Sequence, residues 1–439
     1  MNGLPSNNPM TENFTATRYR LRSVLSGREF EDTGWVLDPP REDQPSLVRA
    51  IYEKKRLEVR DEGFGLYKFC DWLPIRRILK GSAAPVTFKS TGLAKSLGFS
   101  DLHITFSGWW PEKGARMKSC SFKETEAYSV CGRMDGATDK ILVVASAGNT
   151  ARAFAKVCSE NRIPLLLCMP EDTIDAMWFD EPVNDCVRLI VTRSGSDYFD
   201  AIHLSGLVCQ IEKFFPEGGA KNVARRDGMA TTVLSAATAI GRIPDYYFQA
   251  VGSGTGAIAA WEANLRLLED GRYGNHRMKL VVSQNCPFLP MYDAWQAGSR
   301  NLLPLEDDLA RRQVMEIDAK VLSNRRPPYS IAGGLFDALK DSGGSMVKIT
   351  NEEARVASAL FRETEGVSIH PAAAVAVASL VQAARGKALP SDACIMLNIT
   401  GGGEEEFRSG RPMHILKPAA VFDINPPVDE IREKLSERL

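Results

Sequence analysis

The sequence predicts an α/β protein with two open, twisted, mostly parallel β-sheets. From about residue 140 onward, short apolar runs alternate with longer amphipathic ones, which is typical of βαβ units. Glycine-rich turns directly follow three of the apolar runs, at the place where open α/β sheets bind ligands. The chain has 439 residues, enough for two or three domains with a large buried core.

The first sheet is predicted from three apolar runs in the middle of the chain. Residues 140–146 (KILVVAS), 163–170 (IPLLLCMP) and 187–192 (VRLIVT) are short and apolar enough to be buried strands. A helix is expected over residues 151–160, between the first two strands. Another is expected within residues 196–215, where apolar residues recur close to a helical period.

The second sheet is predicted from the carboxyl half. Its strands are expected at residues 246–251 (YYFQAV), 279–283 (KLVVS) and 394–399 (CIMLNI), and an alanine-rich helix follows the first of them. Residues 216–227, rich in glycine and basic residues, are the expected crossover between the two sheets.

Three parts are predicted along the chain. They are an N-terminal extension over residues 1–45, an N-terminal α/β part over residues 46–240 and a C-terminal α/β part over residues 241–439. The segment before residue 85 is expected to be more helical, with residues 45–60 and 71–79 as candidate helices.

Composition argues against nucleic-acid and membrane partners. The chain carries 54 Lys and Arg against 55 Asp and Glu, so it lacks the basic excess of nucleic-acid-binding proteins. Its longest uncharged stretch, residues 366–384, is alanine-rich and contains polar residues, which favours a buried helix over a membrane span. No secretory signal starts the chain, and nine cysteines form no C-x-x-C pair, so we expect free thiols and a cytoplasmic protein. Five scattered histidines predict no metal site.

The first glycine turn follows the strand at residues 140–146 and opens a helix. It consists of Ser146, Ala147, Gly148, Asn149 and Thr150. Small residues at a helix start leave backbone N–H groups open to an anion such as a carboxylate. The same residue types are also common helix caps, so the turn alone predicts only a helix start.

The second glycine turn combines flexible backbone with hydroxyl groups. It consists of Gly252, Ser253, Gly254, Thr255 and Gly256. Exposed amides and two hydroxyls at a strand-to-helix turn favour phosphate binding. The turn also matches the G-x-G-x-x-G/A dinucleotide pattern, but the next strand ends in Ser283-Gln-Asn rather than in the acid that would bind a ribose. A phosphate site is therefore favoured over a dinucleotide site.

The third glycine turn, Thr400 followed by three glycines, closes an apolar strand and allows close backbone approach. Lys123 belongs to the motif Ser121-Phe-Lys-Glu at the start of a helix expected to run to about Met134. Either feature alone is typical of an ordinary turn or a solvated side chain. Their order along the chain is more specific.

Taken together and in order, these motifs resemble the fold-type II pyridoxal-phosphate-dependent enzymes. This tryptophan synthase β-like group includes threonine synthase, cysteine synthase and threonine dehydratase. The resemblance extends over residues 85–403 and rests on the Ser-Phe-Lys motif and the three turns. A further likeness is the stretch from Glu365 to Ala378, which is similar to the Glu-Gly…Pro-Ala helix of the family. The resemblance implies two α/β domains with pyridoxal 5'-phosphate between them.

The resemblance also implies a role for each motif. Lys123 would bind the cofactor covalently and act as the catalytic base, Asn149 would hydrogen-bond the 3′ oxygen and Thr400 would face the pyridine nitrogen. The second glycine turn would hold the cofactor phosphate. Ser146, Ala147, Gly148 and Thr150 would bind the substrate carboxylate.

Within the family, the chain is most similar to threonine synthases, but its motif continues Lys-Glu-Thr-Glu rather than Lys-Asp-Arg. Its N-terminal stretch resembles the zinc-ribbon start of some threonine synthases without the cysteines. Residues 119–124 (SCSFKE) and 325–339 (RRPPYSIAGGLFDAL) resemble a paralogue of threonine synthase. This resemblance implies a β-replacement in which sulfite displaces phosphate from O-phospho-L-serine. Arg325 and Arg326, with Arg116 or Lys118, would bind these oxyanions.

Alternatives remain among enzymes and among binding proteins. A threonine synthase acting on O-phosphohomoserine, or a cysteine synthase using sulfide, would share every cofactor residue. A dinucleotide-dependent protein or an inactive binding module would be colourless when purified, whereas a pyridoxal-phosphate enzyme would be yellow. The resemblance further implies a homo-oligomer.

Overall fold

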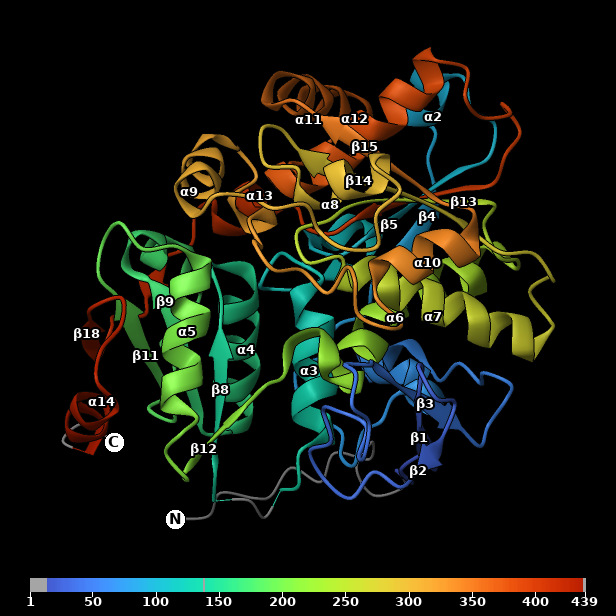
Figure 1. Ribbon diagram of the computed structural model, residues 1–439. Coiled ribbons are helices and arrows are strands. Elements are labelled where there is room, and N and C mark those ends of the chain that lie inside the picture. Colours follow the sequence, from blue (N-terminus) through green and yellow to red (C-terminus); the bar gives the residue numbers. More distant parts are fainter. Residues whose placement is uncertain (1–13, 137–138, 437–439) are drawn as a thin grey trace, which may run out of the picture.

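A computed structural model describes residues 14–136 and 139–436, and Figure 1 shows two α/β lobes with a small third sheet beside them. The predicted class, α/β with two mostly parallel sheets, is confirmed. Among the described residues, no helix is both long and apolar enough to cross a bilayer.

The first sheet has five strands, and all of its pairings are parallel. In spatial order they are β12 (Phe214–Pro216), β8 (Ile141–Ala145), β9 (Leu165–Pro170), β11 (Val187–Thr192) and β18 (Ala420–Phe422). Strand β9 is buried along its whole length. Helices cover both faces of such a sheet, which is why its strands are continuous apolar runs. Among the helices of this lobe are α4 (Asn149–Asn161), α5 (Tyr198–Val208) and α14 (Val428–Ser436).

The second sheet has six strands, of which only β4 is antiparallel to its neighbour. In spatial order they are β15 (Ser345–Ile349), β14 (Lys279–Asn285), β13 (Tyr246–Ala250), β16 (Ile395–Ile399), β5 (Leu102–Phe106) and β4 (Val86–Lys89). Its long helices include α6 (Val223–Ile240), α7 (Thr255–Asp270), α11 (Asn351–Glu365) and α12 (Pro371–Arg385). Helix α12 begins inside the uncharged stretch at residues 366–384 and ends one residue after it, and its residues from Ala372 to Val381 are buried.

The two sheets do not divide along the predicted boundaries. Strands β4 and β5 precede the first lobe in sequence but belong to the second sheet, and β18 returns from the carboxyl end to pair with β11. The lobes are therefore interleaved, and each is built from more than one stretch of chain. Helix α3 (Lys123–Arg133) follows the crossing from β5 and lies between the lobes in Figure 1.

The helix expected over residues 45–60 is wrong. That segment contains β3 (Val48–Tyr52), which pairs with β1 (Tyr19–Ser23), and β1 in turn pairs with β2 (Glu29–Phe30). Along β3 every second residue is buried, the period of a strand with one face on the core. Residues 71–79 contain only the end of a 3₁₀ segment over Glu62–Trp72. The small sheet shares a hydrophobic core with α6 and α7.

Candidate active site

A cavity of about 610 Å³ lies at the carboxyl ends of strands from both large sheets. We call it the site cavity. All three glycine turns reach it, because they follow the parallel strands β8, β13 and β16. The residues singled out from the sequence that line it are Lys123, Ser146, Ala147, Gly148, Asn149, Thr150, Gly252, Ser253, Gly254, Thr255, Gly256, Arg326 and Thr400. Arg325, Arg116 and Lys118 were also singled out but do not belong to this lining.

Lys123 is the first residue of α3, and 21% of its side chain is exposed. Its Nζ lies 3.3 Å from Oε2 of Glu126 and 4.8 Å from the ring centre of Phe122. Burial lowers the pKa of the Lys123 ammonium, and the Glu126 carboxylate opposes that shift. A lysine with a lowered pKa more readily presents the neutral amine that a nucleophile or general base requires.

Glu126 connects Lys123 to a second buried cation, Arg225. The Nη2 of Arg225 lies 3.1 Å from Oε1 of Glu126, and its Nε lies 2.9 Å from Oε1 of Glu217. Burial raises the pKa of Glu217, and Arg225 opposes this shift. We call Glu126, Arg225 and Glu217 the acid–arginine chain. It places Glu217 and Arg225 in the cavity wall and the fully buried Glu126 between Arg225 and Lys123.

The first glycine turn joins β8 to the thirteen-residue helix α4. The Oγ of Ser146 accepts hydrogen bonds from the N–H groups of Gly148 and Ala151, both at 3.0 Å. Gly148 has φ of +149°, which favours glycine. No described residue accepts from the N–H groups of Asn149 and Thr150, so the positive end of the α4 dipole is open to an anion.

The second glycine turn leads from β13 into the sixteen-residue helix α7. The hydroxyls of Ser253 and Thr255 lie 2.8 Å apart and both belong to residues of the cavity wall. A Cβ on Gly252 would come within 2.9 Å of the Leu322 Cα, so the neighbouring segment requires glycine there. Two hydroxyls and a helix start facing a cavity fit a phosphate group.

The third glycine turn is bound directly to the lysine segment. The carbonyl of Thr400 accepts from the N–H of Phe122 at 2.9 Å, and Gly401 pairs with Ser121. A Cβ on Gly403 would collide with the carbonyl oxygen of Trp109. These contacts fix the position of the buried Thr400 relative to Lys123.

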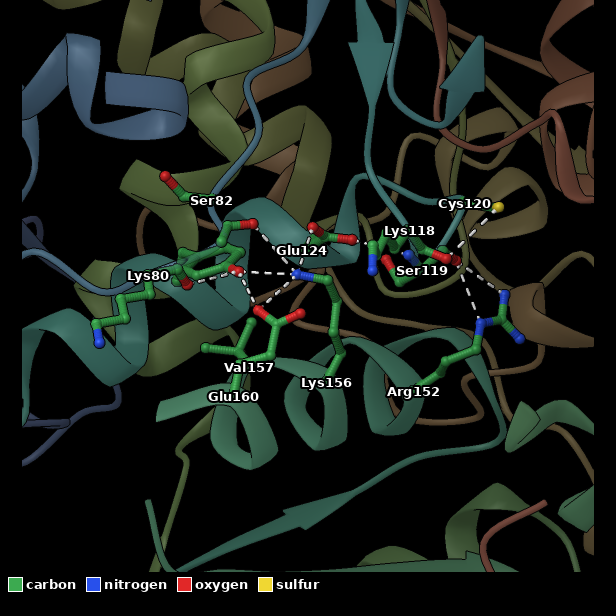
Figure 2. Close-up of polar contacts among 12 residues, drawn as sticks. Lys80, Ser82, Lys118, Ser119, Cys120, Glu124, Arg152, Lys156, Val157 and Glu160 are labelled. Atoms are coloured by element: carbon green, nitrogen blue, oxygen red, sulfur yellow. Dashed lines mark hydrogen bonds and ion pairs between the residues drawn. The ribbon is translucent and has the colours of Figure 1, made fainter. Parts of the chain in front are cut away.

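Helix α4 also braces the start of α3, as Figure 2 shows. The Nζ of Lys156 lies 3.3 Å from Glu124 Oε1 and 3.1 Å from Glu160 Oε2. Arg152 donates to the carbonyl oxygen of Ser119 through Nε at 3.2 Å and Nη2 at 3.1 Å. Both ends of the lysine motif are therefore held by side chains of the helix that follows the first glycine turn.

His370 is a further polar residue of the cavity wall. It precedes α12 and lines the site cavity, and its Nε2 lies 3.0 Å from Oε2 of Glu404. Burial raises the pKa of Glu404, but His370, Arg152 and Arg408 outweigh it and lower that pKa to about 2. The Glu404 carboxylate is thus held ionised behind the third glycine turn, where it fixes the His370 ring.

The two arginines proposed for oxyanion binding differ in their surroundings. Arg325 lies 3.2 Å from Asp197 and 2.9 Å from Asp307, and only 7% of its side chain is exposed. Arg326 is exposed, lines the cavity and lies over the Phe199 ring at 4.8 Å. No acidic partner for Arg326 occurs among residues 14–136 and 139–436. Lys118 pairs with Asp180 at 2.8 Å, and neither Lys118 nor Arg116 lines the cavity.

Sequence reasoning missed three residues of the wall, Tyr198, Glu217 and Arg225, and it missed Glu126, which contacts Lys123 from behind the wall. The spacing of three between Lys123 and Glu126 on a helix is the one local signal, because residues three apart share a helix face. Glu217 and Arg225 come from a distant part of the chain and show no comparable pattern.

One group of potential metal ligands was also missed. Asp101, His103 and Cys394 lie at the amino ends of β5 and β16 with ligand atoms within 4.8 Å of one another. The ammonium of Lys89 lies 2.9 Å from Oδ1 of Asp101. We assign no ion to this group, because Lys89 already neutralises the carboxylate.

The cavity fits pyridoxal phosphate by the chemistry of its wall. The wall has hydroxyls and a helix start suited to a phosphate, a lysine with a lowered pKa, and the polar side chains of Asn149 and Thr400. A family profile described as "Pyridoxal-phosphate dependent enzyme" matches residues 113–401. The chain belongs to this family, and its fold is that of the fold-type II enzymes.

Curated relatives cover nearly the whole chain. A cysteate synthase of Methanosarcina acetivorans is 45% identical over 94% of this chain and 99% of its own length. A cysteate synthase of Methanocella paludicola is 48% identical over 85% of this chain and 87% of its own length.

Solved structures share the fold at low sequence identity. Maize serine racemase matches with a TM-score of 0.57 and 13% identity, covering 80% of this chain and 92% of its own. A threonine deaminase of Solanum lycopersicum matches with a TM-score of 0.51 and 18% identity, covering 74% and 89%.

Proposed function

We propose that the protein is a cysteate synthase that converts O-phospho-L-serine and sulfite to L-cysteate and phosphate. The observation that carries the proposal is the similarity, over nearly the full chain, to several cysteate synthases at 44–48% identity. The site cavity supports it, because Lys123 and two helix starts suited to anions line one wall. In methanogenic archaea this reaction would serve coenzyme M biosynthesis.

The proposed roles follow from where each group lies. Bound pyridoxal phosphate supplies an electron sink for the Cα–H bond of the substrate. The open N–H groups of Asn149 and Thr150 bind the substrate carboxylate, with Ser146, Ala147 and Gly148 shaping the turn. Lys123 Nζ takes the Cα proton and later returns it, while phosphate leaves Cβ and the sulfur of sulfite bonds there. Thr400 offers the pyridine nitrogen a hydroxyl rather than a carboxylate.

Arg326 is proposed to bind the leaving phosphate and the incoming sulfite. It lines the cavity without an acidic partner among the described residues, so its guanidinium is available for a bidentate oxyanion contact. Arg325 is proposed to be less available to an oxyanion, because Asp197 and Asp307 already bind its guanidinium.

Replacing Arg326 with alanine is expected to raise the apparent KM for both phosphoserine and sulfite by at least about tenfold, the loss of one charge-assisted contact. Arg325→Ala is the matched control, with a change of less than about threefold in either KM. Steady-state kinetics with each substrate varied in turn measures both. Equal effects of the two substitutions would contradict the assignment of Arg326.

The proposed activity is tested by incubating the yellow holoenzyme with phosphoserine and either sulfite or sulfide. We expect L-cysteate and one phosphate per cysteate with sulfite, identified by mass spectrometry and phosphate assay. Phosphate release without cysteate, or cysteine as the main product with sulfide, would favour a sulfide-using synthase. Threonine from O-phosphohomoserine would favour threonine synthase.

We also propose a homo-oligomer in the cytoplasm. All nine cysteines have free thiols, including Cys131 and Cys158, whose sulfur atoms lie 3.7 Å apart, which suits a reducing compartment. Sedimentation equilibrium of the purified protein tests the oligomer.

A further inference from the structure

A second cavity, of about 240 Å³, lies between the small N-terminal sheet and helix α7. It shares no lining residue with the site cavity. Its wall is rich in cations, which come from β1, from β3 and the residues after it, and from α7. They are Arg22, Arg49, Lys54, Lys55 and Arg266, against the two acids Glu262 and Glu269. We call it the arginine cavity.

The rim of the arginine cavity is electrically balanced. Arg22 pairs with Glu29, Lys54 lies 2.9 Å from Asp71, and Lys55 lies 3.0 Å from Glu269. The side chains of these three cations are each close to half exposed, so water screens their charges as well. Any excess charge must therefore come from the deeper residues.

Among the deeper residues, the arginines outnumber the carboxylates by one. Glu262 accepts from Arg49 at 3.1 Å and from Arg226 at 2.9 Å, and it is 1% exposed. Asp227 pairs with Arg266 and also accepts from the Tyr52 hydroxyl at 2.5 Å. Three guanidinium groups thus share two carboxylates inside the protein. A buried charge without a partner destabilises the folded protein, so an added anion here would be favoured.

Two of these arginines also lack hydrogen-bond partners on one nitrogen. Nη2 of Arg49 and Nη1 of Arg266 are buried, and no described residue accepts from them. The two side chains line the arginine cavity and remain 21% and 11% exposed. The guanidinium carbon of Arg49 lies 4.2 Å from the centre of the Trp261 ring, so the ring packs against it. In Arg226, by contrast, each nitrogen has a hydrogen-bond acceptor, two of them backbone carbonyl oxygens.

The remaining wall is apolar. Val24, Ile51, Trp72 and Leu265 line the same cavity, so a ligand there would contact hydrocarbon as well as charge. We propose that the arginine cavity binds a small organic oxyanion. Its sulfonate, phosphate or carboxylate head group lies on Arg49 and Arg266, and its short apolar part contacts Trp72 and Leu265.

The helices that build this cavity also build the site cavity. Helix α7 begins at Thr255 in the second glycine turn and carries Glu262 about two turns later and Arg266 about three turns later. Helix α6 places Arg225 on the site cavity and Arg226 and Asp227 in the buried cluster. An anion on the cluster would therefore bind to the same two rigid elements that position the cofactor phosphate turn and the acid–arginine chain.

Calorimetric titration of the holoenzyme with ethanesulfonate tests the proposal, with sulfate as the purely inorganic probe. We expect ethanesulfonate to bind more tightly than sulfate, and Arg49→Met to weaken its binding by at least about tenfold. Arg49→Met leaves Glu262 paired with Arg226, so the fold is expected to persist. Lys55→Met, a rim cation of similar length, is the matched control and should change the affinity by less than about threefold.

Arg326→Ala separates the two cavities, because it removes the oxyanion contact of the site cavity alone. We expect ethanesulfonate binding to survive this substitution. If Arg49→Met proves unstable in thermal unfolding, Leu265→Glu places a negative charge in the same cavity and should weaken binding equally. Binding that is lost in Arg326→Ala but kept in Arg49→Met and Leu265→Glu would overturn the proposal. So would sulfate binding as tightly as ethanesulfonate, or no binding of either ion.

Discussion

Replacing Lys123 with alanine is expected to abolish turnover, with a loss of at least about 10³-fold, because the general base is removed together with the covalent link to the cofactor. The lysine has no substitute nearby. Lys221, the other lysine of the cavity wall, is paired with Asp38 at 2.7 Å. The near-visible absorbance of the covalently bound cofactor should disappear at the same time.

Borohydride reduction gives this prediction a readout that is independent of activity. Treatment of the yellow parent protein should fix the cofactor on the peptide that contains Lys123, and mass spectrometry should find no such tag in the Lys123→Ala variant. Lys118→Ala is the control, since Lys118 lies outside the cavity and pairs with Asp180. A tag on a peptide from elsewhere in the chain would refute the assignment of Lys123.

The convergence of the second and third glycine turns could be predicted from parallel-sheet geometry, whereas the first turn belongs to the other sheet and its place beside them was implied by the family resemblance. Each turn ends an apolar run, and the carboxyl ends of neighbouring parallel strands meet at one edge. The structure accordingly brings Ser146, Gly252 and Thr400 to one cavity, although they are more than 250 residues apart at the extremes. What each turn binds remains a proposal, because backbone geometry alone does not identify an anion.

The rest depended on contacts that no local pattern reports. Strand β3 was mistaken for a helix because its half-buried Arg49 and Ile51 obscure a period of two. Strand β4 lies in the second sheet and strand β18 in the first, each far in sequence from most strands of its sheet. Sequence order does not show which sheet such a short edge strand joins. Arg325 and Arg326 are adjacent residues of the same type, so the sequence does not tell their roles apart. Only the structure shows that Asp197 and Asp307 pair with Arg325.

Replacing Glu126 with glutamine is expected to have the second largest effect on turnover, a decrease of about 10²-fold or more. Glu126 is fully buried, and its carboxylate raises the pKa of Lys123 against the lowering by burial. Without that charge, only the smaller effect of Glu217 opposes the lowering by burial and Arg225, so the pKa of Lys123 falls. A less basic amine accepts the Cα proton less readily, even though more of it is neutral at a given pH.

The direction of this pKa change distinguishes a positioning role from simple damage to the fold. Attachment of the cofactor to the apoprotein requires the neutral amine, so its rate falls on the acid side of the Lys123 pKa. In Glu126→Gln this acid limb should move to lower pH by about one unit or more, equivalent to at least about 1.4 kcal/mol. Stopped-flow absorbance of the apoprotein mixed with pyridoxal phosphate measures the limb directly, with no substrate present.

Glu217→Gln is the matched control, because Glu217 neutralises Arg225 from the other side and, among the described residues, forms no hydrogen bond or ion pair with Lys123. Its loss leaves Glu126 as the only carboxylate on Arg225 within the acid–arginine chain, which draws that carboxylate away from Lys123. The acid limb should therefore move in the same direction but by less than in Glu126→Gln. An unchanged limb in Glu126→Gln, with a thermal unfolding midpoint lowered as for other buried charge losses, would make Glu126 a purely structural residue.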